Sequence, residues 1–321
     1  MAYNVRAADL GGATQGLYIP DHASDIIISE ATSCSTLQHI ANQKYNIESL
    51  GLNCAQTAHY TIINDIEIGD FTGNQWNGEY WEPDDPFRSG QITLCQSVKI
   101  HKKFSREEAT ALCHRWEMVQ GGYETAIAGA LTRHTERYGY KMIAASAYKH
   151  NTGNKAGAMS GNIQLGDTVN PVIIGKNGVN PVTLIELMEQ AIHETGVTCS
   201  GTSLKLVVNP AIFRHIRGVQ SKLGAGGSCL RDNPLITGMV HPILGMEIFS
   251  SINMPRYRRP DGKWVDYILM VNENDIAAPI SLDYLEWSPD KHDIYLIGNY
   301  RFDVAALTSK SIAVAAVVVE D

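Results

Sequence analysis

The chain has 321 residues, of which 44% are hydrophobic, 19% charged and 8% aromatic, and its formal net charge at pH 7 is −8. This length and composition suit a globular protein with a sizeable core and exclude an intrinsically disordered one. The negative charge argues against a protein that binds nucleic acid through a general basic surface. The N-terminus lacks the basic-then-apolar pattern of a signal peptide, and no apolar run approaches the ~18–20 residues that span a bilayer. The six cysteines form no C-x-x-C pair, so we expect reduced, mostly buried thiols.

The N-terminal third predicts an arm followed by a long β-hairpin. Residues 1–58 carry few strong signals and are expected to form an extended arm with little core of its own. Residues 59–100 predict the hairpin, because apolar and polar residues alternate on its return side from Gln91 to Ile100, apart from Gln96.

The loop of this hairpin, residues 71–90, is both aromatic and acidic. Its glycines and prolines exclude a continuous helix, and a projecting loop cannot easily bury five large rings in a core of its own. The sequence therefore predicts an interface, although a loop folded back onto its own domain stays the alternative. The candidate contact residues here are Trp76, Tyr80, Trp81, Glu82, Asp84, Asp85, Phe87 and Arg88.

A small basic cluster lies much later in the chain. Arg256, Arg258 and Arg259 surround Tyr257 and precede Lys263. A solvated loop is the favoured interpretation, ahead of a nucleic-acid patch. The cluster is also a candidate partner for the acidic loop.

The strongest helical pattern covers residues 105–138. Ser105 and Glu108 have capping-box spacing, and apolar residues follow in steps of three or four. A helix of this length predicts a structural spine. Further helices are expected to start at Asn180-Pro181 and Asn209-Pro210, because Asn caps a helix and Pro suits its first turn. Strands are expected at 203–208, 246–251, 265–271, 293–298 and 311–319, which together indicate an α+β class.

The chain contains no strong catalytic or metal-binding motif. The segment 223–228 lacks the Lys-Ser or Lys-Thr of a phosphate loop, and 157–161 misses the G-x-S-x-G pattern by one residue. The eleven histidines form no H-E-x-x-H or paired-cysteine pattern. We therefore expect no cofactor, no metal and no enzymatic activity.

The C-terminal half resembles the major capsid proteins of tailed bacteriophages. In the run 237–255, Gly238, Gly245, Phe249 and Pro255 occupy positions that are similar to a recurrent segment of that family. Residues 264–280 look like the strand and turn that follow it, and 294–317 look like the closing strands.

The resemblance implies the Hong Kong 97-type fold and a role as a capsid protein. It implies an N-terminal arm at 1–58, an extended loop at 59–100, a peripheral domain from 101–150 and 285–321 that contains the spine helix, and an axial domain at 151–284. The implied partners are many copies of the chain in pentamers and hexamers, a scaffolding protein, a portal, a cement protein in some members, and double-stranded DNA enclosed without sequence-specific binding. The implied location is the virion, after assembly in the host cytoplasm.

Two departures from the family limit this transfer. Some members cross-link their subunits through a lysine of the extended loop, but no lysine occurs here between Lys44 and Lys99. Some carry an N-terminal scaffolding segment, which is not evident here, so a separate scaffolding protein is expected. The alternatives are an encapsulin-like compartment shell, which shares the fold, and a soluble enzyme, which would need a pocket with convergent polar groups.

Overall fold

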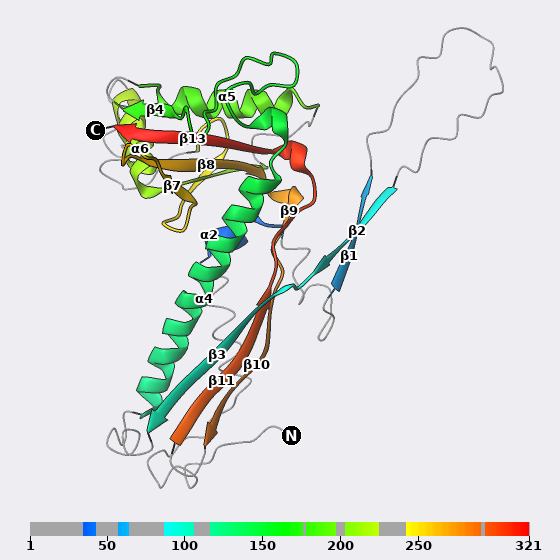
Figure 1. Cartoon of the computed structure of the whole chain (residues 1–321), viewed down its shortest axis with the longest axis vertical. Coiled ribbons are helices and arrows are strands. Elements are labelled where there is room, and N and C mark those ends of the chain that lie inside the picture. The colour runs from blue at the N-terminus through cyan, green and yellow to red at the C-terminus, as the bar shows by residue number, and fades with distance from the viewer. Residues whose placement is uncertain are drawn as a thin grey trace, which may run out of the picture.

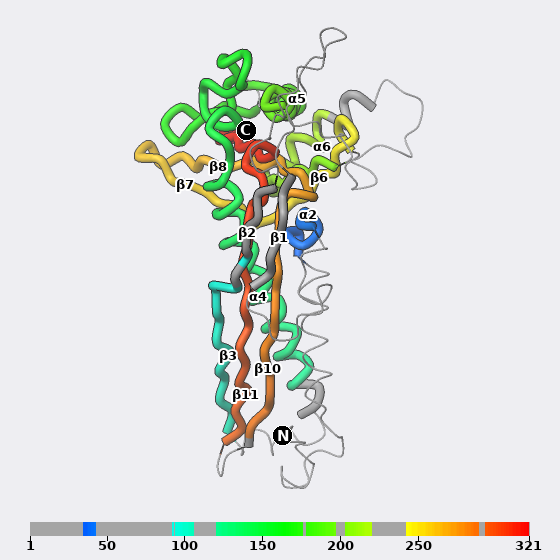
Figure 2. Tube along the Cα trace, turned by 90° about the vertical axis from the view of Figure 1, so that its right-hand side faces the viewer, coloured from blue at the N-terminus to red at the C-terminus, as the bar shows by residue number. Residues whose placement is uncertain are grey.

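A computed structural model describes residues 35–42, 57–63, 87–105, 116–175, 178–196, 203–224, 242–289 and 293–320. The described residues form a compact part at one end of an elongated part, and a two-stranded hairpin extends to one side (Figure 1). The view turned by 90° shows that the elongated part is a narrow strut, in which a helix runs beside long strands (Figure 2). Most of the expected arm, 1–58, lies outside the described residues.

The compact part is built on a six-stranded mixed sheet. Its strands, in spatial order, are β4 (Val172–Gly175), β13 (Ile312–Glu320), β8 (Trp264–Asn272), β5 (Leu204–Val208) and β6 (Glu247–Ser250), and β7 (Arg256–Arg258) pairs with the start of β8. The β13–β4 and β5–β6 pairs are parallel, and the pairs made by β8 are antiparallel. Strands distant in sequence therefore share one core, with β8 at the centre of the sheet.

Two helices cover one face of this sheet. They are α5 (Pro181–His193) and α6 (Pro210–Gly224), which pack on alternate residues of β13 such as Ala313 and Val317. The Asn180 side chain accepts a 3.0 Å hydrogen bond from the Val182 N–H, and Asn209 does the same for Ile212. These contacts satisfy backbone donors that a helix start leaves open, so both predicted helix starts are confirmed.

The elongated part pairs a long helix with a three-stranded antiparallel sheet. The helix is α4 (Trp116–Ser146), and the strands, in spatial order, are β10 (Ile280–Pro289), β11 (Asp293–Phe302) and β3 (Gln96–Ser105). Along β11 every second residue is buried, including Leu296 and Phe302, and these pack with Leu131 of α4. The period of two in the strand thus meets the apolar stripe of the helix.

A third core cluster joins the two parts. Helix α2 (Thr36–Ile40) packs against the C-terminal half of α4 and the second face of the six-stranded sheet. Gly139 of α4 permits this approach, since a Cβ there would lie 2.6 Å from a Leu37 methyl group. The remaining short elements are β9 (Ile276–Ala277), β12 (Ala305–Ala306) and the 3-10 helices Lys149–Asn151, Glu273–Asp275 and Ser309–Ser311.

The structure corrects three sequence-based boundaries. Helix α4 continues to Ser146 rather than ending near residue 138, because Tyr140 and Ile143 extend its buried stripe. The return side of the hairpin is not one strand: β2 (Phe87–Thr93) pairs with β1 (Thr57–Ile63), and after residues 94–95 β3 joins another sheet. The tail 285–321 is divided, since β11 lies in the strut but β13 lies in the compact part. Ser105 ends β3, and Glu108 lies outside the described residues.

Candidate assembly surfaces

The extended hairpin carries the aromatic, acidic segment that the sequence singles out. Its strands pair in antiparallel register, with Phe87 opposite Ile63 and Arg88 opposite Ile62. On β2 the side chain of Ile92 is buried. The other candidate contact residues of the hairpin, Trp76, Tyr80, Trp81, Glu82, Asp84 and Asp85, lie outside the described residues. Their role at an interface stays a prediction.

The basic cluster is a β-hairpin rather than an irregular solvated loop. Its strands β7 and β8 pair Arg256 with Asp266 and Arg258 with Trp264. The turn between them follows from Pro260-Asp261-Gly262, in which Gly262 adopts a φ of 82°. The Arg259 N–H donates to the Lys263 carbonyl at 2.9 Å and closes the turn. We call residues 256–264 the arginine hairpin.

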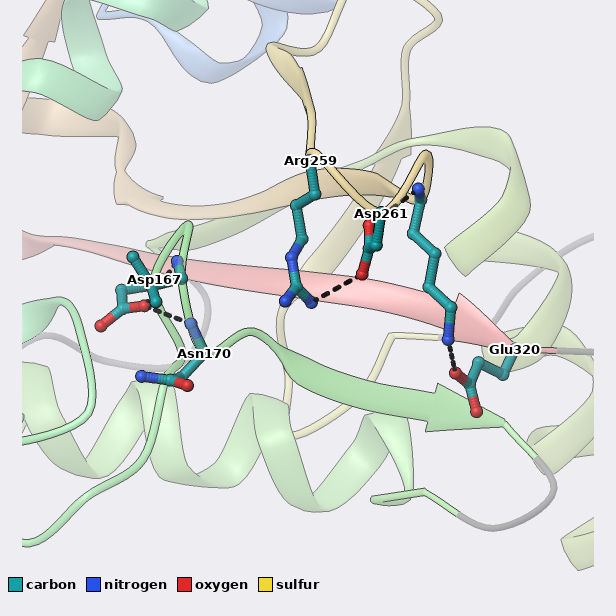
Figure 3. A network of polar contacts seen from close by, with 7 residues as sticks. Asp167, Asn170, Arg259, Asp261 and Glu320 are labelled. Carbon is teal, nitrogen blue, oxygen red and sulfur yellow. Dashed lines mark hydrogen bonds and ion pairs between the residues drawn. The ribbon is translucent and has the colours of Figure 1, made fainter.

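Most cations of the arginine hairpin already have a carboxylate partner within the chain. Arg256 Nε lies 2.6 Å from an oxygen of the buried Asp266, and Lys263 Nζ lies 2.6 Å from Glu320. Arg259 lies 3.6 Å from Asp261. Figure 3 shows this ion pair and the one made by Glu320. Among the described residues, no carboxylate pairs with Arg258.

Trp264 forms the platform of this hairpin. The guanidinium carbons of Arg256 and Arg258 lie 4.8 and 5.9 Å from the centre of its ring, which is cation–π geometry. Trp264 and Tyr257 are 46% and 47% exposed. Trp264 and the Arg258 guanidinium, which has no carboxylate partner among the described residues, therefore face solvent together, whereas Tyr257, opposite Val265, is exposed on the other side of the hairpin. The cross-strand spacing that aligns arginines with Trp264 is a sequence signal that the loop interpretation missed.

A second surface lies on the outer side of α5, where the sequence gave no signal. An open cleft of ≈550 Å³ is lined by Met159, Glu186, Glu189, Gln190, His193 and Glu194, and we call it the α5 cleft. Its rim is a loop in which Ala156 and Ile163 form an antiparallel bridge. Met159 projects from that loop and is 85% exposed.

Glu194 clamps the loop to the helix end. One carboxylate oxygen accepts from the N–H groups of Met159 (3.1 Å) and Ser160 (2.9 Å) and from the Ser160 hydroxyl (2.9 Å). The other accepts from Gln190 at 2.8 Å. The hydrogen bond from the Ser160 N–H contributes most to lowering the pKa of Glu194. The backbone beneath Met159 is therefore held in place although its side chain is exposed.

The junction of strut and compact part is polar at one point, the buried carboxylate of Glu136. It accepts hydrogen bonds from Thr36, Ser251 and Asn253, which belong to the α2 segment and to the loop after β6. The neighbouring Tyr140 hydroxyl contacts the Thr36 hydroxyl, and burial, followed by the Glu136 charge, raises the pKa of Tyr140. Glu136 thus fixes three chain segments relative to one another.

Within the described part of the chain, no group of three or more His, Cys, Asp or Glu side chains is arranged to hold a metal ion. No helix there is long and apolar enough to cross a membrane. Cys95 is exposed, and the other five cysteines lie outside the described residues, so the expected burial of most thiols stays a prediction.

Solved structures of viral shells resemble this chain over most of its length. A structure from Mycobacterium phage Che8 matches with a TM-score of 0.55 at 13% identity, covering 89% of this chain and 91% of that one. The capsid of an empty GTA particle matches with a TM-score of 0.54 at 13% identity, covering 89% and 90%. The procapsid of satellite phage P4, which includes the size determination (Sid) protein, matches with a TM-score of 0.52 at 10% identity, covering 98% and 96%. No protein-family model matches the chain, and no curated protein sequence matches it.

These matches define the class of fold. The chain has the α+β fold of phage capsid proteins, the Hong Kong 97-type fold that the sequence resemblance implied. At 10–14% identity among the capsid matches, the likeness concerns the fold, so function rests on what this fold and its surfaces support.

Proposed function

We propose that this chain is the major capsid protein of a tailed bacterial virus, which assembles into the icosahedral shell around the genome. One observation carries the proposal: the match to the capsid structures runs through nearly the whole of both chains, strut and compact part together. A shared substructure inside an unrelated enzyme would cover one part only. The role is structural, and among the described residues no catalytic constellation supports a different one.

The two parts of the molecule suit the two demands of a shell. The strut of α4 and the three-stranded sheet is a stiff element that can span the space between neighbouring rings of subunits. The compact part, which includes β4 to β8 and β13, is assigned as the axial domain that packs around fivefold and sixfold centres. Each contact can be weak, because a subunit that touches many neighbours at once gains stability through multivalency.

The extended hairpin is proposed to lie across an adjacent subunit. Its segment from Glu79 to Asp85 contains four carboxylates and no cation, so it favours a basic surface. Arg88 and the arginine hairpin were the candidates from sequence. Three of the four cations of the arginine hairpin have carboxylate partners within the chain. By contrast, Lys99 and Lys102 on β3 are exposed and have no ion pair with a described residue.

The wider set of partners follows from the proposed role. A separate scaffolding protein, a portal and, in a decorated shell, a cement protein would bind the assembled chain. Double-stranded DNA would be enclosed without sequence-specific contacts, in keeping with the net charge of −8. Assembly would occur in the bacterial cytoplasm, and the product would be the virion.

Sedimentation velocity of the expressed chain, alone and with the scaffolding protein from the same genome, tests the proposal. Capsomer rings or faster-sedimenting closed particles support it, and a monomer or dimer under both conditions contradicts it. The contents of particles purified from the native source separate the two kinds of shell. Nuclease-protected DNA supports the virus, and a packaged enzyme supports the encapsulin-like alternative.

A further inference from the structure

The arginine hairpin and the α5 cleft are two separate surfaces of the compact part. Helix α5 packs on the face that contains Ala315 and Val317, whereas Val265 at the base of the hairpin packs on the other face with Ala316 and Val318. Figure 1 shows α5 above β13 and β8, and the hairpin with β7 below them. The side chains of Arg258 and Trp264 point the other way from Val265, because they are in line with Asp266 and Val317 on the face that α5 covers.

The chemistry of the two surfaces is complementary. The hairpin presents the Arg258 guanidinium together with the half-exposed ring of Trp264. The cleft presents the carboxylates of Glu186 and Glu189 beside the thioether of Met159. Guanidinium groups pair with carboxylates, and methionine sulfur packs favourably against aromatic rings. Both sides are held by their own backbone, the hairpin by its β7–β8 pairing and the cleft rim by Glu194.

We infer that the arginine hairpin of one copy docks into the α5 cleft of a second copy. Because the two surfaces differ, the contact is head-to-tail, and repetition of a head-to-tail contact closes a ring when its rotation allows. The inference rests on the proposed function and deepens it by naming one contact that joins neighbouring compact parts. No described residue of the chain covers Met159. In this arrangement the arginine hairpin of the second copy packs against it.

Charge exchange between the two surfaces tests the docking in the full-length chain. Arg258→Glu and Glu186→Arg are each expected to weaken association about tenfold or more, the scale measured for close charge pairs across interfaces. The double variant, Arg258→Glu with Glu186→Arg, is expected to regain most of the lost assembly in sedimentation velocity. Lys141→Glu is the matched control, because it makes the same charge change on an exposed position of α4. Circular dichroism verifies the fold of each variant.

Several outcomes would overturn the inference. The inference is wrong if both single variants assemble as well as the wild-type chain. It is also wrong if the double variant does not regain assembly. Rescue of Arg258→Glu by Asp84→Arg with Asp85→Arg, instead of by Glu186→Arg, would assign the hairpin to the acidic loop. In each of these cases the wild-type chain still assembles, so the proposed function survives. A wild-type chain that never assembles would overturn both.

Cross-linking provides a second measurement that does not depend on charge variants folding well. A chain carrying Met159→Cys and Tyr257→Cys, treated with a short bismaleimide under assembly conditions, is expected to give a ladder of covalent oligomers. Each single-cysteine variant controls for the native thiols, including the exposed Cys95. A ladder no stronger than that of the single variants would contradict the docking.

Discussion

The carboxylate of Glu136 accepts a 2.7 Å hydrogen bond from the backbone N–H of Thr36, a residue 100 positions earlier in the chain. The same carboxylate accepts from Ser251 at 2.9 Å and from Asn253 at 2.7 Å. Since Glu136 lies on α4, one buried charge ties the α2 segment and the compact part to the spine. Hydrogen bonds to a charged acceptor are stronger than neutral ones, and here several converge on one group.

Replacing Glu136 is therefore expected to be costly. Glu136→Ala leaves the buried donors of Ser251 and Asn253 without their acceptor and should lower the free energy of unfolding by about 3 kcal/mol. Glu136→Gln keeps one carbonyl oxygen but turns an amide N–H toward donors, and should cost about 2 kcal/mol. Urea unfolding of the unassembled chain measures both. The control is Lys141→Ala, at an exposed position of the same helix, which should change the free energy of unfolding by no more than about 0.5 kcal/mol. If Glu136→Ala changed it by no more than this control, the stabilising role assigned to Glu136 would be contradicted.

The Glu194 clamp predicts a pH-dependent loop. Because hydrogen bonds lower the folded-state pKa of Glu194 below its ordinary 4.5, the stabilisation is fully present above that value. It is lost as the pH falls through the lower, folded-state pKa. Glu194→Gln should remove this dependence and speed amide hydrogen exchange at Met159 and Ser160 at neutral pH. Unchanged exchange in the variant would show that the loop is held by other contacts.

Gly166 is a position where any side chain is excluded. Its φ is 78°, and a Cβ would lie 2.3 Å from the carbonyl oxygen of Ala316 and 2.8 Å from the Val172 nitrogen. Gly166→Ala should therefore destabilise the chain by about 3 kcal/mol through backbone strain and displacement of β4 from β13. Gly153→Ala is the matched control, since Gly153 has a φ of 82° but open space around it. Its cost should be about 1 kcal/mol, and equal costs at the two sites would contradict the steric argument.

The acidic loop gives a prediction about salt. Charge reversal by Asp84→Lys with Asp85→Lys should reduce assembly at low ionic strength, because the loop is proposed to lie against a basic surface of a neighbour. Added salt should shrink the difference between variant and wild type. Light scattering during assembly measures the effect. Equal assembly of variant and wild type at low salt would refute an electrostatic role for the loop.

Local sequence patterns predicted much of the fold, because helix capping, hydrophobic periodicity and β-propensity depend on residues that are close together in the chain. The Asn-Pro starts of α5 and α6 and the apolar strands β5, β8, β11 and β13 follow from capping, periodicity and β-propensity. Contacts between residues distant in sequence produce no such local pattern. Nothing local reveals that β13 pairs with β8 and β4 instead of joining the strut, or that Gly139 lies inside a helix so that Leu37 can approach it.

The candidate surfaces divide in the same way. Composition found the arginine cluster and the acidic loop, since charge and aromatic content can be read directly from the sequence. The α5 cleft could not be found, because its rim and its floor are brought together by Glu194 across more than thirty residues. Likewise, the internal ion pairs that neutralise Arg256 and Lys263 depend on tertiary pairing with Asp266 and Glu320.

Electron microscopy of the expressed protein in negative stain tests the central claim most directly. The proposed capsid function predicts closed shells, tubes or rings of five or six subunits, formed by the chain alone or once its scaffolding protein is supplied. A uniform field of particles no larger than a monomer or dimer, with and without scaffolding protein, would contradict it.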